Sequence, residues 1–333
     1  MSHSNISIFV PHLGCPNRCS FCDQNIISGA EKSPKTEDIN KAVLTAKASL
    51  NYNSATTELA FFGGSFTAID REYMVELLSD AKRFVDAGDI SGIRISTRPD
   101  CIDEDVLQLL KQYGVKAIEL GAQSMSDEVL KANNRGHRAV DVINASSLIK
   151  SYGFQLGLQM MTGLYKSTYE VDKFTAKEIV LLKPDTVRIY PTITLFGTKL
   201  EALVKSGEYI PPSLYETVDL CAELLDLFEL NEIKVIRTGL HTIDESRYVA
   251  GPWHPAFREL CDSKRYLNKI IEILPEKGEY ILSVNPKEIS KATGNKKANI
   301  IKLKDLGYKV SVKGDGSLEP LQVTFERMNN SCF

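Results

Sequence analysis

Three cysteines within one short segment constrain this chain more than any other feature of its sequence. Cys15, Cys19 and Cys22 follow a C-x3-C-x2-C pattern. Closely spaced thiolates are soft ligands that can close around a single metal centre. Structural zinc takes four protein ligands, and iron–sulfur cubanes are usually held by four cysteines. Three thiolates therefore predict a metal centre with one position open for a ligand that reacts there.

The residues alone leave two other interpretations of this trio open. A distant fourth ligand would complete a zinc site, and thiols without a metal would simply be buried. The other four cysteines are too dispersed to form a second cluster, and we expect buried thiols at Cys101, Cys221, Cys261 and Cys332.

The composition is that of an ordinary globular protein. The 333 residues are 43% hydrophobic and 25% charged, with a net charge of −3, and this length suits one large domain and a small one. The sequence has no apolar run long enough for a membrane span and begins directly with a strand-like segment rather than a signal peptide. Seven cysteines in a chain of this length suit a reducing compartment. We therefore expect a cytoplasmic protein with no membrane partner.

Short apolar segments alternate with amphipathic helical stretches through the first part of the chain. This alternation predicts a parallel α/β barrel, with a flavodoxin-like open sheet as the alternative. In either architecture, ligands bind beyond the carboxyl ends of the strands. Residues 233–236 also have a strand-like pattern. The six main strands, with the exit of the third included, are predicted at residues 6–10, 58–62, 93–100, 115–122, 156–161 and 186–191.

Two motifs stand at predicted strand ends. The cysteine segment follows the first strand at once, and Gly63-Gly64 follow the second. Paired glycines after a strand let backbone N–H and C=O groups approach a ligand closely. We therefore expect the metal centre and the glycine turn to share one edge of the sheet.

The cysteine segment resembles the signature of the radical S-adenosylmethionine (SAM) enzymes, C-x3-C-x-aromatic-C, with Phe21 at the aromatic position. The resemblance implies that Cys15, Cys19 and Cys22 hold a [4Fe–4S] cluster whose fourth iron binds SAM. It also implies that an electron, from a donor such as flavodoxin or ferredoxin, cleaves SAM reductively to a 5′-deoxyadenosyl radical. The implied fold over residues 1–275 is the partial (β/α)6 parallel barrel of this superfamily together with a helical extension.

Further motifs narrow the resemblance to the Elp3-like group, whose best-known member is the catalytic subunit of Elongator, which modifies wobble uridine in tRNA. Oxygen-independent coproporphyrinogen III oxidases share a looser version of the pattern. The chain ends at Phe333, so we expect the radical SAM part without the acetyltransferase domain of the Elongator subunit. The matching segments, in chain order, are residues 63–67, 96–100, 121–124, 134–137 and 188–192.

The same resemblance implies a set of SAM contacts. The alternative for each polar side chain is a hydrogen bond that caps a barrel strand. Ser96 stands where the family usually has a glutamate that contacts the ribose. The implied contacts are Gly63, Gly64, Ser65 and Thr67 for the SAM amino group, Ser96, Gln123 and Gln159 for the ribose, Arg135 for the carboxylate, and Arg188 beside the ligand.

Residues 276–333 predict a separate, small α+β unit. Their strand–helix–turn–helix–strand pattern resembles the core of a KH domain, whose G-x-x-G turn clamps a nucleic-acid backbone. Between residues 285 and 313, eight lysines stand against two acidic residues, a local charge of +6. We expect Gly294, Lys296 and Lys297 at the turn to contact RNA; the alternative is a solvated lysine face.

Three hypotheses for the function follow. The first is a radical SAM enzyme that acts on RNA, with a tRNA base as the substrate and the basic C-terminal unit as the docking surface. The second is a radical SAM enzyme that acts on a small molecule or peptide. The third is a zinc-stabilised RNA-binding protein without radical chemistry.

Overall fold

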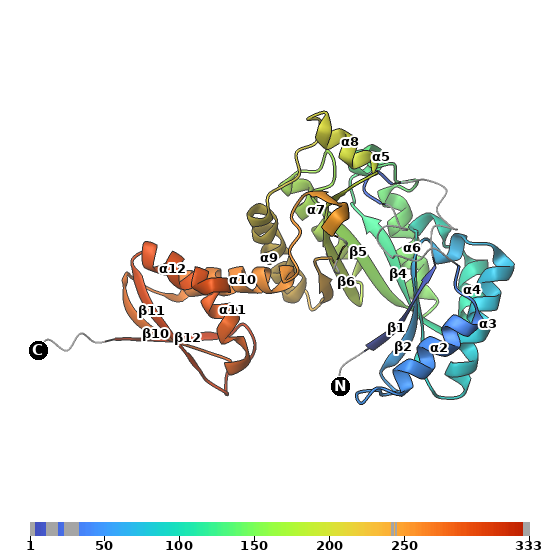
Figure 1. Ribbon diagram of the computed structural model, residues 1–333, viewed down its shortest axis with the longest axis horizontal. Coiled ribbons are helices and arrows are strands. Elements are labelled where there is room, and N and C mark those ends of the chain that lie inside the picture. The colour runs from blue at the N-terminus through green and yellow to red at the C-terminus, as the bar shows by residue number, and fades with distance from the viewer. Residues whose placement is uncertain (1–3, 11–18, 23–32, 241–242, 244, 329–333) are drawn as a thin grey trace, which may run out of the picture.

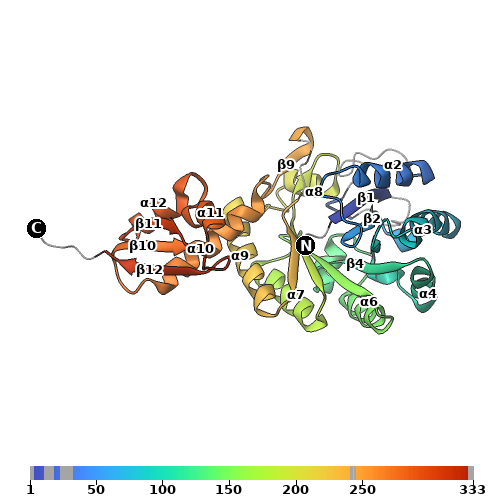
Figure 2. The ribbon, with the colours of Figure 1, turned by 90° about the horizontal axis from the view of Figure 1, so that it is seen from below.

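The larger part of the protein is a curled parallel sheet with helices on its outside (Figures 1 and 2). The computed structural model describes residues 4–10, 19–22, 33–240, 243 and 245–328. The sheet has seven strands in the order β1-β2-β3-β4-β5-β6-β8, all paired in parallel. The predicted parallel half-barrel is thus confirmed, and a seventh strand, β8, extends it. The strands are β1 (Ser4–Val10), β2 (Thr57–Gly63), β3 (Gly92–Thr97), β4 (Val115–Gln123), β5 (Gln155–Thr162), β6 (Thr186–Pro191) and β8 (Lys234–Thr238).

The connecting helices begin at side chains that cap them. Asp70, Asp103, Ser126, Thr168 and Ser213 each accept a hydrogen bond from a backbone N–H of the first turn, which satisfies a donor that has no partner inside the helix. The helices are α2 (Thr36–Lys47), α3 (Arg71–Asp86), α4 (Glu104–Gln112), α5 (Asp127–Ala132), α6 (Ala139–Ser151), α7 (Tyr169–Leu182), α8 (Lys199–Lys205) and α9 (Leu214–Leu230), with short 3₁₀ turns at Phe66–Ala68, Pro99–Cys101 and Glu245–Arg247.

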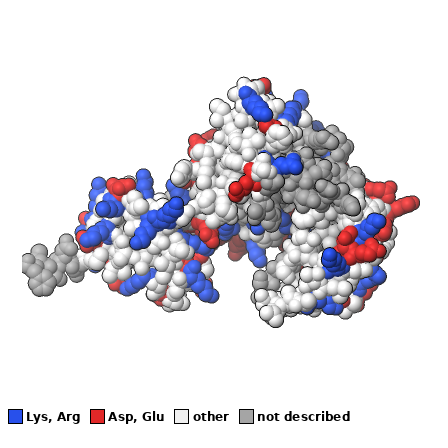
Figure 3. Space-filling model, viewed as in Figure 1, with Lys and Arg blue, Asp and Glu red and all other residues white. Residues whose placement is uncertain are grey.

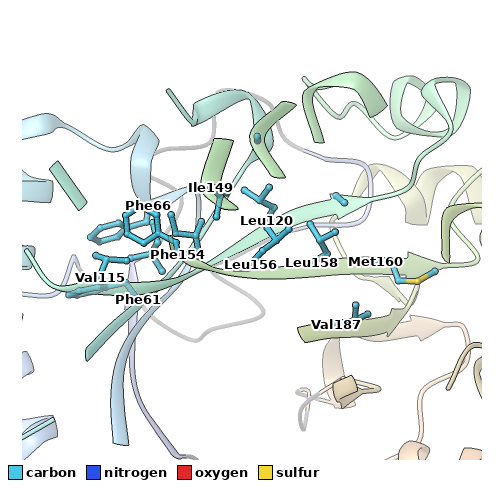
Figure 4. Close-up of a cluster of buried hydrophobic side chains, with 14 of the residues drawn as sticks. Phe61, Phe66, Val115, Leu120, Ile149, Phe154, Leu156, Leu158, Met160 and Val187 are labelled. Carbon is cyan, nitrogen blue, oxygen red and sulfur yellow. The ribbon is translucent and has the colours of Figure 1, made fainter. Parts of the chain in front are cut away.

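The two faces of the curled sheet differ in polarity. Successive side chains of a strand point to opposite faces. On the helix-covered side lies an aliphatic and aromatic core (Figure 4), in which the rings of Phe61 and Phe66 stack with centroids 4.7 Å apart. On the concave side, polar residues of different strands bond to one another, as Arg188 of β6 does with Glu119 of β4, across the intervening strand β5, at 2.8 Å. The concave side is therefore a polar surface inside an apolar shell.

A short antiparallel ribbon begins just after the end of strand β6. It pairs β7 (Thr194–Leu195) with β9 (Tyr248–Ala250). Gly251, directly after β9, lies close to the residue that follows β6, since a Cβ at Gly251 would be only 3.0 Å from the Thr192 carbonyl oxygen. Gly251 has a φ of 112°, which only glycine adopts readily.

One helix, α10 (Phe257–Ile273), connects the half-barrel to the C-terminal unit. Phe257 and Cys261, in its first turns, belong to the core of the half-barrel, whereas Leu267 and Ile270 belong to the core of the C-terminal unit. Arg265, only 2% exposed, donates to Asp226 of α9 at 2.6 Å. The helix is therefore packed into both parts of the protein.

The C-terminal unit has the predicted strand–helix–helix–strand order. Its central strand, β10 (Gly278–Val284), pairs in parallel with β11 (Tyr308–Gly314) and antiparallel with β12 (Val323–Arg327). The last strand was not predicted from the sequence. The helices are α11 (Ile289–Thr293) and α12 (Ala298–Asp305), with 3₁₀ turns at Pro286–Glu288 and Asn295–Lys297. The boundary between residues 275 and 276 stays a prediction, because α10 contributes to both cores.

Among the described residues, no helix is long and apolar enough to cross a membrane.

Candidate functional site

Residues 19–22, the described part of the cysteine segment, lie at the carboxyl edge of the half-barrel and are fixed there by their own contacts. Cys15 lies outside the described residues, whereas Cys19 and Cys22 are partly exposed. Between them, Ser20 donates from its hydroxyl to Asn133 Oδ1 at 2.7 Å, and its backbone N–H donates to the Asn133 carbonyl at 3.1 Å. The ring of Phe21 packs against a small apolar cluster that includes Val129, Met161 and Leu164. The two described thiols are thus held in place by α5 and β5.

Arg135 joins the cysteine segment to strand β4. Its Nη1 donates to Cys19 Sγ at 3.2 Å, and its Nη2 donates to the Gly121 carbonyl at 2.8 Å. Its Nε is buried and has no hydrogen-bond partner among the described residues. A buried N–H without a partner is uncommon in proteins, so this guanidinium has one donor available for a ligand at the same edge.

The two predicted glutamines meet on neighbouring strands. Gln159 of β5 donates from Nε2 to Gln123 Oε1 at 3.1 Å. Gln123 has a φ of 64°, a left-handed conformation at the point where the β4–β5 register shifts. The structure brings both side chains to the edge that carries Arg135, as expected if they serve one ligand.

The glycine turn after β2 is built against the end of β1. Gly64 N–H donates to the Val10 carbonyl at 2.9 Å, and a Cβ at Gly63 would lie 2.5 Å from that oxygen. Only glycine allows this approach at a φ of 116°. Ser65 is buried, and the Thr67 hydroxyl lies 2.6 Å from the Thr97 hydroxyl and donates to the Cys101 carbonyl. Thr67 therefore ties the exits of β2 and β3 together.

Below this edge, four buried charged side chains from strands β2, β3, β4 and β6 form a series of ion pairs. Of these four residues, only Arg188 was singled out from the sequence. Glu58 of β2 accepts from Arg94 of β3 at 2.7 Å. Glu119 of β4 lies 3.3 Å from Arg94 and 2.8 Å from Arg188. The sequence does place a charged residue inside each of these apolar strands. Because buried charges must be paired, such residues predict ion pairs between strands. Ser96 of β3 is half-buried and lies in register with Glu119.

The Arg188 guanidinium also lies over the Phe62 ring, 4.9 Å from its centroid, within the range of a cation–π contact. Its Nη1 donates to the Tyr190 hydroxyl at 3.4 Å, and its buried Nε has no partner within the described part of the chain. Arg188 thus lies on the concave face with one donor unused.

Two titratable side chains near this edge have shifted pKa values. Burial and, after it, the neighbouring Arg135 guanidinium together lower the pKa of His137 to about 4. The ring is therefore neutral at physiological pH, with Nε2 3.1 Å from the Ala122 carbonyl oxygen. Burial raises the pKa of Asp172 to about 6, although the carboxylate accepts hydrogen bonds from Ser167 and from the backbone of Gly163.

Lys and Arg side chains are spread over the C-terminal unit, with some acidic side chains among them (Figure 3). At the turn, Gly294, Lys296 and Lys297 have φ values of 79°, 52° and 63°. Lys297 thus adopts the left-handed backbone of a G-x-x-G turn without being glycine. Of the eight lysines, Lys291, Lys309 and Lys313 pair with carboxylates. Within the described part of the chain, the others have no carboxylate partner: Lys287, Lys296, Lys297, Lys302 and Lys304.

A cavity of about 270 Å³ lies elsewhere, between the half-barrel and the C-terminal unit. Lys234 and Val235 line it at the amino end of β8, the edge opposite to the cysteine segment. It is therefore separate from the candidate site.

The residues at the carboxyl edge fit SAM and a [4Fe–4S] cluster. Two described thiols offer soft ligands, the glycine turn exposes backbone, and the unpartnered Nε of Arg135 can meet a polar ligand. Among the described residues no three metal-binding side chains come together, because Cys15 lies outside them.

Comparison with known proteins gives two family matches. Residues 9–177 match the model of the radical SAM superfamily, and residues 184–269 match the radical SAM C-terminal domain. Among solved structures, the archaeal Methanocaldococcus infernus Elp3 with an N-terminal deletion superimposes with a TM-score of 0.66 at 23% identity, covering 81% of this chain and 64% of that one. That likeness concerns the fold.

Two relatives come from Methanocaldococcus jannaschii. A tRNA uridine(34) acetyltransferase is 35% identical over 184 residues, which are 49% of this chain and 34% of the relative. An uncharacterised protein is 27% identical over 275 residues, covering 81% of this chain and 79% of the relative. The match to the acetyltransferase thus spans about a third of that protein's length.

Proposed function

Because the chain belongs to the radical SAM superfamily, whose enzymes use SAM and a [4Fe–4S] cluster, we propose that it cleaves SAM reductively to modify a base in tRNA. The cluster would be held by Cys15, Cys19 and Cys22. When bound, it would supply the electron for SAM cleavage, received from a donor of the flavodoxin or ferredoxin type.

One contact carries this proposal: the hydrogen bond from Arg135 to Cys19. It joins a cluster cysteine to a residue 116 positions further along the chain, at the edge where Gln123 and Gln159 also meet. A hydrogen bond to a ligating sulfur raises a cluster's reduction potential and orients the thiolate. Arg135 would therefore tune the cluster through Nη1 and bind SAM through its unused Nε.

The polar concave face would do the rest of the binding. Gly63 and Gly64 would offer backbone to the SAM amino group, and Gln123 and Gln159 would hold the ribose hydroxyls. The Glu119 carboxylate fixes the guanidinium of Arg188, whose unused Nε would meet the ligand. Because Gln123, Gln159 and Arg188 are oriented by strands and not by loops, little reorganisation of these side chains is needed when SAM binds.

The tRNA substrate rests on two observations. The M. jannaschii relative is named for tRNA uridine(34), and five lysines of the C-terminal unit lack carboxylate partners among the described residues. Free lysines on one surface attract a phosphate backbone. We propose that this lysine surface docks tRNA while the half-barrel receives the base.

Anaerobic purification followed by iron and sulfide analysis tests the chemistry. The wild type should carry four irons per chain, as a [4Fe–4S] cluster requires, and should form 5′-deoxyadenosine from SAM when reduced with dithionite. The triple variant Cys15→Ala, Cys19→Ala, Cys22→Ala should do neither, whereas the control Cys332→Ala should do both. A triple variant that keeps its full iron content would refute the assignment.

Bulk tRNA binding across a salt series tests the docking surface. The double variant Lys296→Glu, Lys297→Glu should bind more weakly and with a flatter salt dependence, by roughly one unit of slope for each phosphate that is no longer neutralised. The control Lys177→Glu, Lys183→Glu makes the same charge change on exposed lysines at α7. Equal affinity and slope for the two double variants would remove the C-terminal unit from substrate docking.

A further inference from the structure

The β7–β9 ribbon, whose strand β9 is labelled in Figure 2, carries large aromatic side chains that are exposed to solvent. Phe196, directly after β7, is 57% exposed, and Tyr248 of β9 is 36% exposed. The Phe196 N–H donates to the Arg247 carbonyl at 2.8 Å, so the two segments stay side by side beyond the paired residues. Large exposed aromatic residues grouped on one element are typical of interaction sites.

Cations flank these aromatic residues. Arg247 precedes Tyr248 in the chain, Lys199 follows Phe196 by three positions, and both are exposed. Aromatic rings alternating with cations are what single-stranded nucleic acid requires, because bases stack on the rings and phosphates meet the charges. A protein partner of apolar character would need no such cations, so the charge favours a polyanion.

Within and beside the ribbon, three buried polar atoms have no hydrogen-bond partner among the described residues: Oγ1 of Thr192, Oγ1 of Thr194 and Nε1 of Trp253. The two threonines are completely buried. The Trp253 ring lies 6.1 Å from the Tyr248 ring. Buried polar groups in proteins are nearly always bonded. Trp253 is partly exposed, so its indole N–H is the donor of this group that a polar, uncharged ligand group can meet.

We propose that the ribbon is a stacking platform for unpaired nucleotides next to the reacting base. This inference rests on the proposed RNA substrate. Phe196 and Tyr248 stack on bases, Arg247 and Lys199 meet phosphates, and the indole N–H of Trp253 donates to a base carbonyl. The ribbon thereby selects single-stranded regions, such as a loop, at the edge where the cysteine segment lies.

The first test measures binding of a fluorescently labelled, single-stranded oligouridylate to the holoprotein by anisotropy. Phe196→Ala and Tyr248→Ala should each weaken binding roughly 5- to 150-fold, the range that loss of one base–aromatic stack gives. The matched control is Phe174→Ala, because Phe174 of α7 is 47% exposed and lies outside the ribbon. Equal affinities for the ribbon variants and the control would overturn the proposal.

The second test uses the chain's single tryptophan as a reporter. The Trp253 ring lies next to the Tyr248 ring of the platform. Oligouridylate should therefore quench the fluorescence of Trp253 in the wild type and much less in Tyr248→Ala. Lys296→Glu, Lys297→Glu should leave this quenching unchanged, because the short oligonucleotide needs only the ribbon. Oligouridylate that binds without changing the fluorescence of Trp253 would overturn the platform.

Different results would refute the proposed RNA substrate and the proposed stacking platform. If neither bulk tRNA nor oligouridylate binds the wild type, the RNA substrate itself is wrong, and the platform falls with it. If bulk tRNA binds and its binding is abolished in the lysine variant but not in Phe196→Ala or Tyr248→Ala, the substrate stands and the platform alone is refuted. Water would then be the partner of the three buried polar atoms.

Discussion

Replacing Glu119 with glutamine should destabilise the half-barrel far more than its small chemical change suggests. The carboxylate lies between two guanidinium groups, 3.3 Å from Arg94 and 2.8 Å from Arg188. The side chains of Glu119 and Arg94 are 5% exposed and that of Arg188 is 14% exposed. With Glu58 included, the four charges sum to zero. Glu119→Gln leaves one buried positive charge without a counter-charge.

Breaking a buried ion pair from one side costs about 3–5 kcal/mol. We therefore expect Glu119→Gln to lower the free energy of unfolding by about that amount. Adding Arg188→Met should restore part of the loss, because it removes the uncompensated charge. This recovery is a coupling energy, and a double-mutant cycle measures it.

Urea unfolding followed by circular dichroism is a suitable assay. The control is Glu326→Gln, because Glu326 pairs with Lys313 at 3.1 Å with side chains 65% and 49% exposed. Exposed pairs contribute up to about 1 kcal/mol. A loss for Glu119→Gln no larger than for Glu326→Gln, or no recovery in the double variant, would refute the role of the carboxylate as shared counter-charge.

Three further predictions concern single residues. Arg135→Ala should weaken SAM binding by about 1.5–3 kcal/mol, the value of a hydrogen bond to a charged group. Calorimetry measures this loss, and Arg138→Ala, at an exposed arginine, is the control. Equal dissociation constants for the two variants would contradict the prediction. Gly63→Ala should destabilise the protein in thermal unfolding, because its Cβ would clash with the Val10 carbonyl at 2.5 Å; an unchanged melting temperature would show that the turn relaxes. The pKa of His137 is about 4 when folded and about 6.5 when unfolded, so the unfolded chain binds the proton first and stability falls by up to about 3 kcal/mol as pH drops from 6.5 towards 4. His137→Gln should remove this component of the acid dependence, and identical stability-versus-pH curves for the two proteins would argue against it.

The six strands and the edge that carries the chemistry were predictable because both depend on local patterns. Apolar runs alternating with helical periodicity indicate a parallel sheet, and motifs that follow a strand fall at its carboxyl end. The contact between Arg135 and Cys19 agrees with this logic, although its geometry came only from the structure.

Other features depend on which strands become neighbours, which local patterns do not reveal. Glu58, Arg94 and Glu119 are ordinary charged residues until the sheet curls and brings them together. Strand β12 was missed because most of its residues are exposed, so its sequence carries no buried apolar pattern. The left-handed φ of Lys297 was likewise unexpected, since only glycine adopts it without cost.

Helix α10 fixes the distance between the half-barrel and the C-terminal unit. Its 17 residues span about 25 Å at 1.5 Å per residue, and side chains at its two ends are built into different cores. The C-terminal unit cannot swing without unpacking one of those cores. An RNA bound to the lysines would therefore reach the edge that carries the cysteines at one fixed distance. The position of the modified nucleotide would then depend on its distance along the RNA from the bound segment as well as on the identity of the base.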